Sequence, residues 1–280
     1  MYPHPEPDSP ETFAPWSRGC RMSLRETHLP TVDMRHGEAL SVLSTLDAAS
    51  VDAVITDPPY SSGGMVRGDR TAGVHAKYVR RDSRSGNRLA AFGGDNRDQR
   101  SFAYWSALWL SEALRVTTPG GVLAVFTDWR QLPTTTDAIQ AGGWVWRGIV
   151  PWHKPNGRRC QGRFANNCEY IVWGTCGPRP LNIVPHAPDG FFQINTPRQR
   201  EHITQKPLEL MRHLVTITPA GGLILDPFAG TGTTGVAAVL EGRSFLGVEA
   251  SDHFHTIATR RLAEATELID QRGEQPTLTP

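Results

Sequence analysis

The residues best suited to chemistry form the tetrapeptide Asp57-Pro-Pro-Tyr60, which directly follows an apolar segment. The exocyclic amine of a nucleobase is a poor nucleophile because its lone pair is delocalised into the ring. An enzyme acting on that amine must orient it with acceptors, which the Asp57 carboxylate and the Pro58 carbonyl could supply. Pro58 and Pro59 fix φ and hold the carbonyl in place, while Tyr60 can stack on an extruded base. Taken alone, the tetrapeptide also fits an ordinary turn after a strand.

A second candidate site is a glycine-rich loop in which Gly230, Gly232 and Gly235 spell GxGxxG. Backbone N–H groups at a helix N-terminus bind anionic groups. Glu249 comes nineteen residues after Gly230, where a carboxylate can accept hydrogen bonds from ribose hydroxyls. The loop alone fits a dinucleotide site, an S-adenosylmethionine site or a turn that packs a helix on a strand. Only 45 residues follow Gly235, too few for the rest of a sequential dinucleotide domain.

Alternating strand and helix patterns position the two motifs. The expected strands are Val51–Thr56, Val122–Phe126, Trp146–Trp152, Tyr170–Trp173, Gly222–Asp226 and Ser244–Glu249. The expected helices cover 38–46, 102–116, 206–218 with Pro207 in the first turn, the segment from the glycine loop to Leu240, and 252–269. A turn is expected at Pro119–Gly121. This order predicts an α/β fold with a mainly parallel sheet and helices on both faces, whose carboxyl edge carries both motifs.

The chain divides by composition into three parts. Residues 1–30 are rich in Pro and polar residues and predict a disordered extension, while 271–280 form a tail. Residues 31–270 are expected to form one domain, in which the Gly- and Arg-rich segment 61–100 is a long functional loop.

Charge is unevenly distributed along the chain. The total is +1, which argues against a uniformly basic protein. Residues 61–100 nevertheless carry a net charge of +5 and residues 147–213 a net charge of +6, so the remainder carries −10. Two basic segments on an acidic scaffold fit attraction to a polyanion such as nucleic acid, with solvated loops as the alternative.

Composition favours a folded, soluble and cytoplasmic protein. No apolar stretch approaches the ~18 residues that a membrane span needs, and the N-terminal residues lack the layout of a secretion signal. The cysteines do not follow the spacing of a zinc site, so we expect reduced thiols and no metal. They are Cys20, Cys160, Cys168 and Cys176.

Together and in this order, the two motifs resemble those of the β-class DNA amino-methyltransferases, in which the catalytic tetrapeptide precedes the cofactor loop. The resemblance extends from about Val32 to Leu262 and implies a Rossmann-like methyltransferase sheet with circularly permuted motif order. Further segments that carry it are Ser50–Thr56, Pro119–Gly121, Thr204–Leu210 and Gly242–Glu249.

The resemblance implies that S-adenosylmethionine is the cofactor. The glycine loop would hold its methionine part, Glu249 its ribose, and Lys206 and Thr204 would lie beside its carboxylate. The cofactor-binding residues implied are Asp226, Pro227, Phe228, Gly230, Thr231, Gly232, Thr233, Thr234, Glu249, Lys206 and Thr204. Asp57, Pro58, Pro59 and Tyr60 would be the catalytic residues that hold the target base.

The form Asp-Pro-Pro-Tyr resembles that of adenine-specific members, whereas members that methylate cytosine more often begin with Ser. The resemblance therefore implies direct in-line transfer of a methyl group to adenine N6 in double-stranded DNA, with the base flipped out and no covalent intermediate. The resemblance is also compatible with a homodimer and with a cognate restriction nuclease as a partner. The resemblance implies that residues 177–203 form a short target-recognition insert. The expected DNA-contacting residues are Glu38, Arg67, Arg70, Arg80, Arg81, Arg198 and Arg200.

Other functions remain in competition at this point. N4 of cytosine or RNA could replace adenine in DNA as the substrate. A dinucleotide-dependent oxidoreductase would explain the glycine loop and Glu249 but gives the tetrapeptide no role. A DNA-binding module without activity would explain the basic segments but not an intact cofactor loop.

Overall fold

The structure, a computed structural model, describes residues 29–60, 97–157, 159, 161–197 and 205–273. These residues form an eight-stranded sheet in the order β1-β8-β7-β2-β3-β5-β4-β6. The strands are β1 Val32–His36, β2 Val51–Thr56, β3 Thr117–Thr127, β4 Val145–His153, β5 Cys168–Thr175, β6 Phe192–Gln193, β7 Leu223–Asp226 and β8 Ser244–Glu249. The helices are α1 Ala39–Leu43, α4 Gln99–Val116, α5 Leu132–Ala141, α6 Leu208–Val215, α7 Thr233–Leu240 and α8 Asp252–Gly273.

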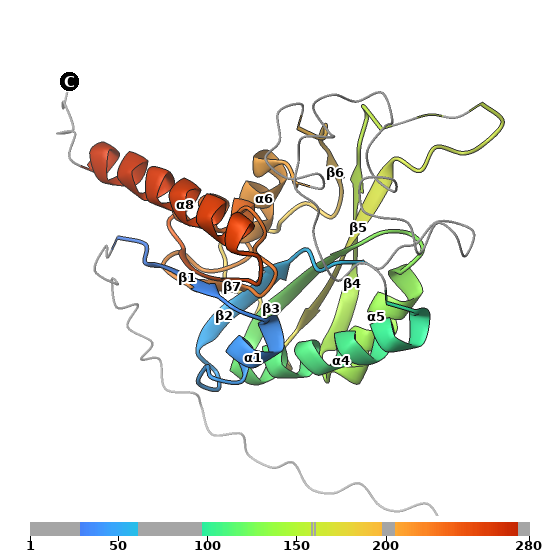
Figure 1. Cartoon of the computed structure of the whole chain (residues 1–280), viewed down its shortest axis with the longest axis horizontal. Coiled ribbons are helices and arrows are strands. Elements are labelled where there is room, and N and C mark those ends of the chain that lie inside the picture. Colours follow the sequence, from blue (N-terminus) through green and yellow to red (C-terminus); the bar gives the residue numbers. More distant parts are fainter. Residues whose placement is uncertain (1–28, 61–96, 158, 160, 198–204, 274–280) are drawn as a thin grey trace, which may run out of the picture.

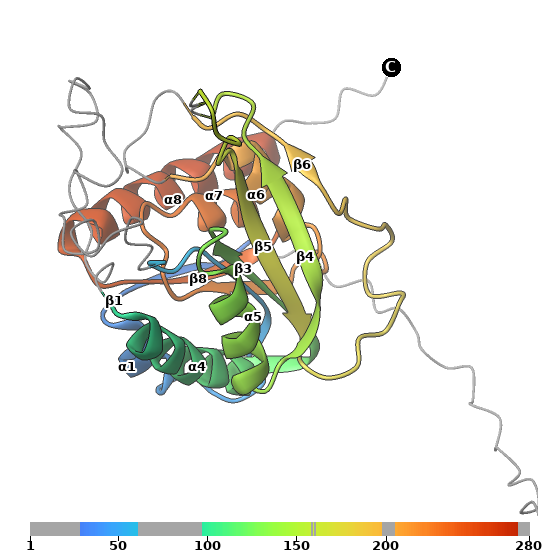
Figure 2. The same cartoon turned by 90° about the vertical axis from the view of Figure 1, so that its right-hand side faces the viewer.

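Helices cover both faces of the sheet, as the sequence predicts. Helices α1, α4 and α5 lie on one face, and α6, α7 and α8 lie on the other (Figures 1 and 2). No helix in the described ranges combines the length and the apolar character that crossing a membrane requires.

The sheet is parallel over its first five strands, β5 pairs antiparallel with both of its neighbours, and β6 pairs parallel with β4 at the far edge. Strands β1, β8, β7, β2 and β3 pair in parallel, whereas β5 pairs antiparallel with both β3 and β4. The carboxyl ends of β2, β7 and β8 therefore meet at one edge of the sheet. Since β5 runs the opposite way, its first residues and the end of β4 lie at that same edge.

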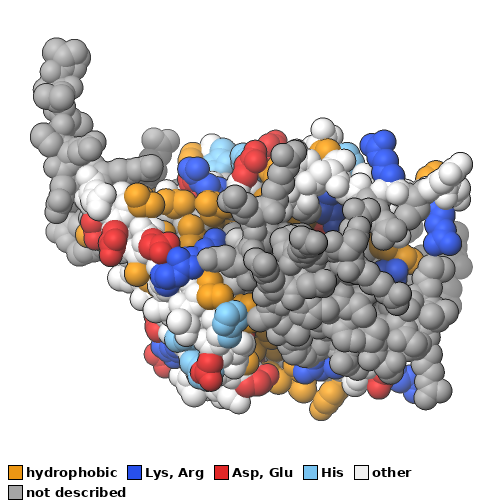
Figure 3. Space-filling view, turned by 45° about the horizontal axis from the view of Figure 1, so that its top comes forward, with side chains coloured by type: hydrophobic (Ala, Val, Ile, Leu, Met, Phe, Trp, Pro, Cys, Tyr) orange, Lys and Arg blue, Asp and Glu red, His pale blue; other side chains and the backbone are white. Residues whose placement is uncertain are grey.

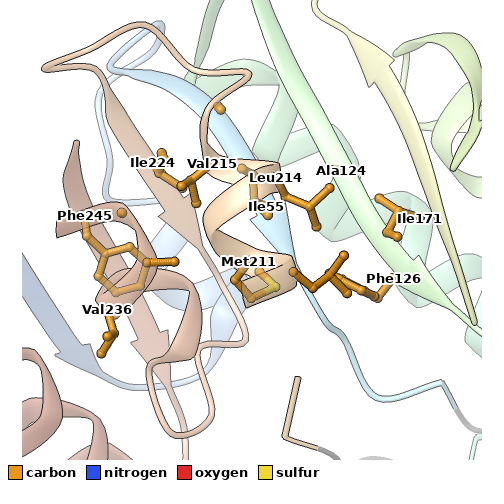
Figure 4. Packing of buried hydrophobic residues seen from close by; sticks show 14 of the residues in the cluster. Ile55, Ala124, Phe126, Ile171, Met211, Leu214, Val215, Ile224, Val236 and Phe245 are labelled. Carbon is orange, nitrogen blue, oxygen red and sulfur yellow. The ribbon is translucent and has the colours of Figure 1, made fainter. Parts of the chain in front are cut away.

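Continuous apolar runs in the central strands build the core. Ile55 on β2 and Ile224 on β7 are fully buried beneath α6, whose Met211 and Leu214 pack in the same cluster (Figure 4). On the opposite face, Trp109 of α4 belongs to a second buried cluster. Strands buried on both faces are typical of a parallel sheet, and their ends are rigid supports for a site.

The predicted turn at Pro119–Gly121 is wrong, because these residues belong to β3. The pairing of β2 with β3 shifts there, from Val51 opposite Thr117 to Ala53 opposite Val122, so β3 carries a bulge. Gly120 has φ 79° and donates its N–H to the carbonyl of Cys176 at the end of β5. The neighbouring strand thus holds the extra residues within the sheet.

Other elements differ from the prediction at their bounds or in their presence. Pro207 is the N-cap of α6 and not part of its first turn, and α8 continues to Gly273. Strands Val51–Thr56 and Ser244–Glu249 have the predicted bounds. The pattern did not predict β1, α5 or β6. The predicted loop 61–100 lies mostly outside the described residues.

Candidate active site

The two sequence motifs meet at the carboxyl edge of the sheet. Asp57 directly follows β2, and Asp226 ends the neighbouring parallel strand β7. Glu249 ends β8, which is the next strand along. The predicted placement of the tetrapeptide beside the glycine loop is therefore confirmed.

The Asp57 carboxylate is bound on both oxygens by other side chains of the chain. Its Oδ1 accepts a hydrogen bond from Tyr60 Oη at 2.6 Å, and its Oδ2 accepts one from Lys206 Nζ at 2.5 Å. Burial raises the pKa of Asp57 and the Lys206 charge opposes that rise. Burial alone would lower the pKa of Lys206, but the neighbouring carboxylates outweigh it and raise that pKa. Lys206 is thus a buried ammonium, 6% exposed, that neutralises Asp57.

Two site residues were missed by the sequence analysis, Glu169 and Lys154. Glu169 Oε2 lies 3.3 Å from Lys206 Nζ and accepts a hydrogen bond from Tyr60 Oη at 3.3 Å. Glu169 Oε1 accepts a hydrogen bond from Lys154 Nζ at 2.8 Å. Burial would raise the pKa of Glu169, but the two lysines lower it to about 2, so this carboxylate stays ionised.

Each glycine of the loop has a distinct structural reason. Gly230 and Gly232 have φ of 53° and 77°, in the left-handed region that favours glycine. A Cβ at Gly235 would lie 2.4 Å from Phe245 Cδ1, so this glycine lets α7 pack closely on β8. A Cβ at Gly230 would meet nothing within 4 Å, so the loop is open at this residue.

The buried Asp226 side chain anchors this loop by hydrogen bonds. Its Oδ1 accepts from Thr56 Oγ1 at 2.6 Å and from the Phe228 N–H at 3.0 Å. Its Oδ2 accepts from Thr234 Oγ1 at 2.6 Å. Burial raises the pKa of Asp226 to about 6. One carboxylate therefore joins the end of β2, the loop and the first turn of α7.

Glu249 at the end of β8 and Arg261 of α8 also form hydrogen bonds with the loop. Glu249 Oε2 accepts a hydrogen bond from the Gly230 N–H at 2.9 Å, and burial raises the pKa of Glu249. Arg261 of α8 donates to the Thr231 carbonyl at 2.5 Å and to Thr233 Oγ1 at 3.2 Å. No sequence pattern singles out Arg261, because only the packing of α8 brings it to the loop.

The remaining predicted residues fall into two groups. The Phe228 ring packs on Trp105 and Trp109 of α4, with ring centroids 5.4 and 5.2 Å away, and Glu38 caps α1 by accepting from the Ser41 N–H. The other predicted residues lie outside the described ranges: Thr204, Arg67, Arg70, Arg80, Arg81, Arg198 and Arg200.

Acidic and basic side chains are interspersed over the described part of the face in Figure 3.

Comparison with known proteins agrees with this geometry. The family model for N6/N4 DNA methylases matches residues 51–260, a span that includes the tetrapeptide and the glycine loop. The type II methyltransferase M2.MboI of Moraxella bovis is 25% identical over 264 residues, which cover 85% of this chain and 90% of that protein.

Solved structures share the fold. TTHA0409 of Thermus thermophilus, in complex with S-adenosyl-L-methionine, has a TM-score of 0.62 at 23% identity and covers 84% of this chain and 96% of its own. The cytosine-N4-specific PvuII DNA methyltransferase has a TM-score of 0.63 at 15% identity. The match covers 87% of this chain and 93% of the PvuII enzyme. With its Asp-Pro-Pro-Tyr tetrapeptide set beside a glycine loop inside the matched region, this chain belongs to the N6/N4 DNA methylase family and is a DNA methyltransferase.

Proposed function

We propose that the protein transfers a methyl group from S-adenosylmethionine to the N6 amine of adenine in DNA. The observation that carries this proposal is the placement of Asp57 and Tyr60 at the end of β2, next to the glycine loop at the end of β7. A base-binding tetrapeptide and a cofactor loop at adjacent strand ends can bring a nucleophile and a methyl donor together. The first residue being Asp and not Ser favours adenine over cytosine.

The residues of the loop fit S-adenosylmethionine. The open space above Gly230 leaves room for a ligand, and the N-terminus of α7 offers backbone N–H groups to a carboxylate. Glu249 lies at the edge of this space and would accept from the ribose hydroxyls. Lys206 would contact the cofactor carboxylate. Residues for the methionine part would be Asp226, Pro227, Phe228, Gly230, Thr231, Gly232, Thr233 and Thr234, with Thr204 near the carboxylate.

The residues of this chain would orient the target amine and accept its proton. When bound, S-adenosylmethionine supplies an electrophilic methyl group, which the amine nitrogen takes as the S–C bond breaks. Asp57 and the Pro58 carbonyl accept hydrogen bonds from the two N–H groups of the amine and turn the nitrogen lone pair toward the methyl carbon. The Asp57 carboxylate takes the surplus proton from nitrogen, and the Tyr60 ring stacks on the flipped base. The residues that would contact DNA are Glu38, Arg67, Arg70, Arg80, Arg81, Arg198 and Arg200.

The test is expression in a host without DNA methylation, followed by single-molecule sequencing of its DNA for modified bases. N6-methyladenine at one fixed sequence is the expected result, absent when Asp57→Ala is expressed. N4-methylcytosine instead would contradict the choice of base, and DNA without modification would contradict the function. A nuclease encoded beside the gene and specific for the same sequence would establish the restriction partner. Sedimentation of the purified protein would show whether it forms a dimer.

A further inference from the structure

Glu169 and Lys154 extend the site away from the glycine loop. Contacts run from Asp57 to Lys206, from Lys206 to Glu169 and from Glu169 to Lys154, over 2.5, 3.3 and 2.8 Å. These four residues come from four parts of the chain: the end of β2, the end of β4, the start of β5 and the segment before α6. The antiparallel pairing of β4 with β5 brings Glu169 and Lys154 together, because Lys154 follows β4 and Glu169 lies near the start of β5.

Lys206 lies between two carboxylates and is closer to Asp57. The ring centroids of Phe126 and Tyr60 lie 5.0 and 5.4 Å from its Nζ, so aromatic faces flank the ammonium. With 6% of its side chain exposed, this charge has little access to water. A buried ammonium that loses its carboxylate partner strongly destabilises the protein, so Lys206 needs a carboxylate at every stage.

Binding of the target amine disturbs this arrangement. If Asp57 accepts hydrogen bonds from the base, as the proposed function on which this inference rests requires, the amine must share the carboxylate with the donors already present or displace one of them. Tyr60 occupies Oδ1 and Lys206 occupies Oδ2. Among the described residues, Glu169 is the other carboxylate paired with Lys206. The cofactor carboxylate proposed beside Lys206 would be present both before and after the amine binds, so it does not replace Asp57 in this exchange. Movement of Nζ toward Glu169 would free Asp57 Oδ2 without leaving either charge unpaired.

We propose that Glu169 is a positioning residue that takes Lys206 from Asp57 when the target amine binds. Lys154 fixes the receiving carboxylate by binding its Oε1, which leaves Oε2 directed at Lys206. The backbone N–H of Lys154 donates a hydrogen bond to the Asn167 carbonyl at 2.7 Å, so the connection between β4 and β5 holds Lys154 in place. Glu169 acts through Lys206 and does not itself touch the base.

A crystal structure of the wild-type protein with S-adenosylhomocysteine and its target duplex tests the movement directly. The duplex is the methylated sequence that the sequencing experiment identifies. We expect Lys206 Nζ within about 3.2 Å of Glu169 and no longer hydrogen-bonded to Asp57. Lys206 still bonded to Asp57, with the base in the site, would overturn the proposal.

Glu169→Gln removes the receiving charge at constant shape, and Glu169→Asp keeps it. Asp57 is faced by Lys206, Tyr60, Glu169 and Asp226, and Asp128 lies near Tyr60. Because the Glu169 charge raises the pKa of Asp57, Glu169→Gln should move the acid limb of kcat to lower pH. We expect kcat to fall about tenfold or more, with the dissociation constant of S-adenosylhomocysteine changed less than about threefold. Glu169→Asp should keep the acid limb of the wild type.

Glu264→Gln is the matched control, because Glu264 is exposed on α8 and pairs with Arg260. We expect it to keep the kcat and pH profile of the wild type. A wild-type kcat and acid limb in Glu169→Gln would contradict the role of Glu169 while leaving the proposed function intact. Methylation of cytosine by the wild-type protein would change only the assigned base. A wild-type protein that methylates no DNA would overturn both proposals.

Discussion

Thr56 Oγ1 donates a hydrogen bond to Asp226 Oδ1 over 2.6 Å, although the two residues are 170 positions apart in the sequence. Thr56 is the last residue before the tetrapeptide, and Asp226 opens the glycine loop. Both side chains are buried. This bond therefore joins the base-binding half of the proposed site to the cofactor-binding half.

Thr56→Val keeps the shape of the side chain and removes the donor to the buried Asp226 carboxylate. We expect the free energy of unfolding to fall by about 1–3 kcal/mol, because the carboxylate loses a partner that water cannot replace. Urea denaturation measures this change. Thr256→Val on the exposed side of α8 is the control and should change stability by less than about 0.5 kcal/mol. Equal losses in both variants would show that the Thr56 bond contributes nothing specific.

Asp226 should make stability depend on pH. Its pKa is about 6 in the folded protein and 3.8 ordinarily, so the folded state holds the proton more strongly. The resulting stabilisation is complete below the ordinary pKa and is lost as pH rises through 6. The stability of the wild type relative to Asp226→Asn should fall by roughly 2 kcal/mol between about pH 4 and about pH 7. Denaturation of both proteins across this range measures it, and a constant difference would contradict the raised pKa.

Asp57→Ala should separate catalysis from cofactor binding. Removal of the carboxylate should lower kcat by about two orders of magnitude or more, because the target amine loses its main acceptor. Lys206 keeps Glu169 as a partner, so the dissociation constant of S-adenosylhomocysteine should change less than about threefold. Asp33→Ala, at an exposed position on β1, is the control for loss of a carboxylate. Undiminished turnover in Asp57→Ala would contradict the catalytic assignment.

Arg261→Gln should weaken cofactor binding. The guanidinium donates to Thr231 and Thr233, so its loss should let the loop relax and raise the dissociation constant of S-adenosylhomocysteine about tenfold. Titration calorimetry measures this constant. Arg260→Gln changes the neighbouring residue, whose ion pair with Glu264 is exposed, and should leave the affinity unchanged. An equal effect of the two variants would exclude a specific role for Arg261.

The sequence predicted those parts of the fold that local pattern determines. Strands Val51–Thr56 and Ser244–Glu249 are short and mostly apolar, and each ends at a polar residue, so the sequence indicated where they begin and end. Because parallel strands place their carboxyl ends together, the meeting of the tetrapeptide with the glycine loop followed. Helix α5 escaped prediction since its first turns contain three consecutive threonines, which favour strands.

The rest of the site depends on pairing that no local pattern specifies. Glu169 meets Lys206, and Lys154 meets Glu169, because β5 runs antiparallel beside β3 and β4, and the sequence did not indicate that direction. Arg261 reaches Thr231 through the packing of α8 over the loop. The direct ligand contacts expected of Asp226 and Glu249 stay predictions, and both carboxylates bind backbone N–H groups of the loop itself.

Strand β1, the first in the described chain, pairs with β8, and the later half of α8 lies beside it, where Leu262 and Glu267 share a groove with Val32. The path of the described chain therefore nearly closes on itself. If the end of α8 were linked to the start of β1 and the chain opened between β6 and α6, the glycine loop would come first and the tetrapeptide last. Neither strand end would need to move. The order in which a gene encodes the two motifs does not determine whether they meet, because they are brought together by adjacent positions in the sheet and not by succession along the chain.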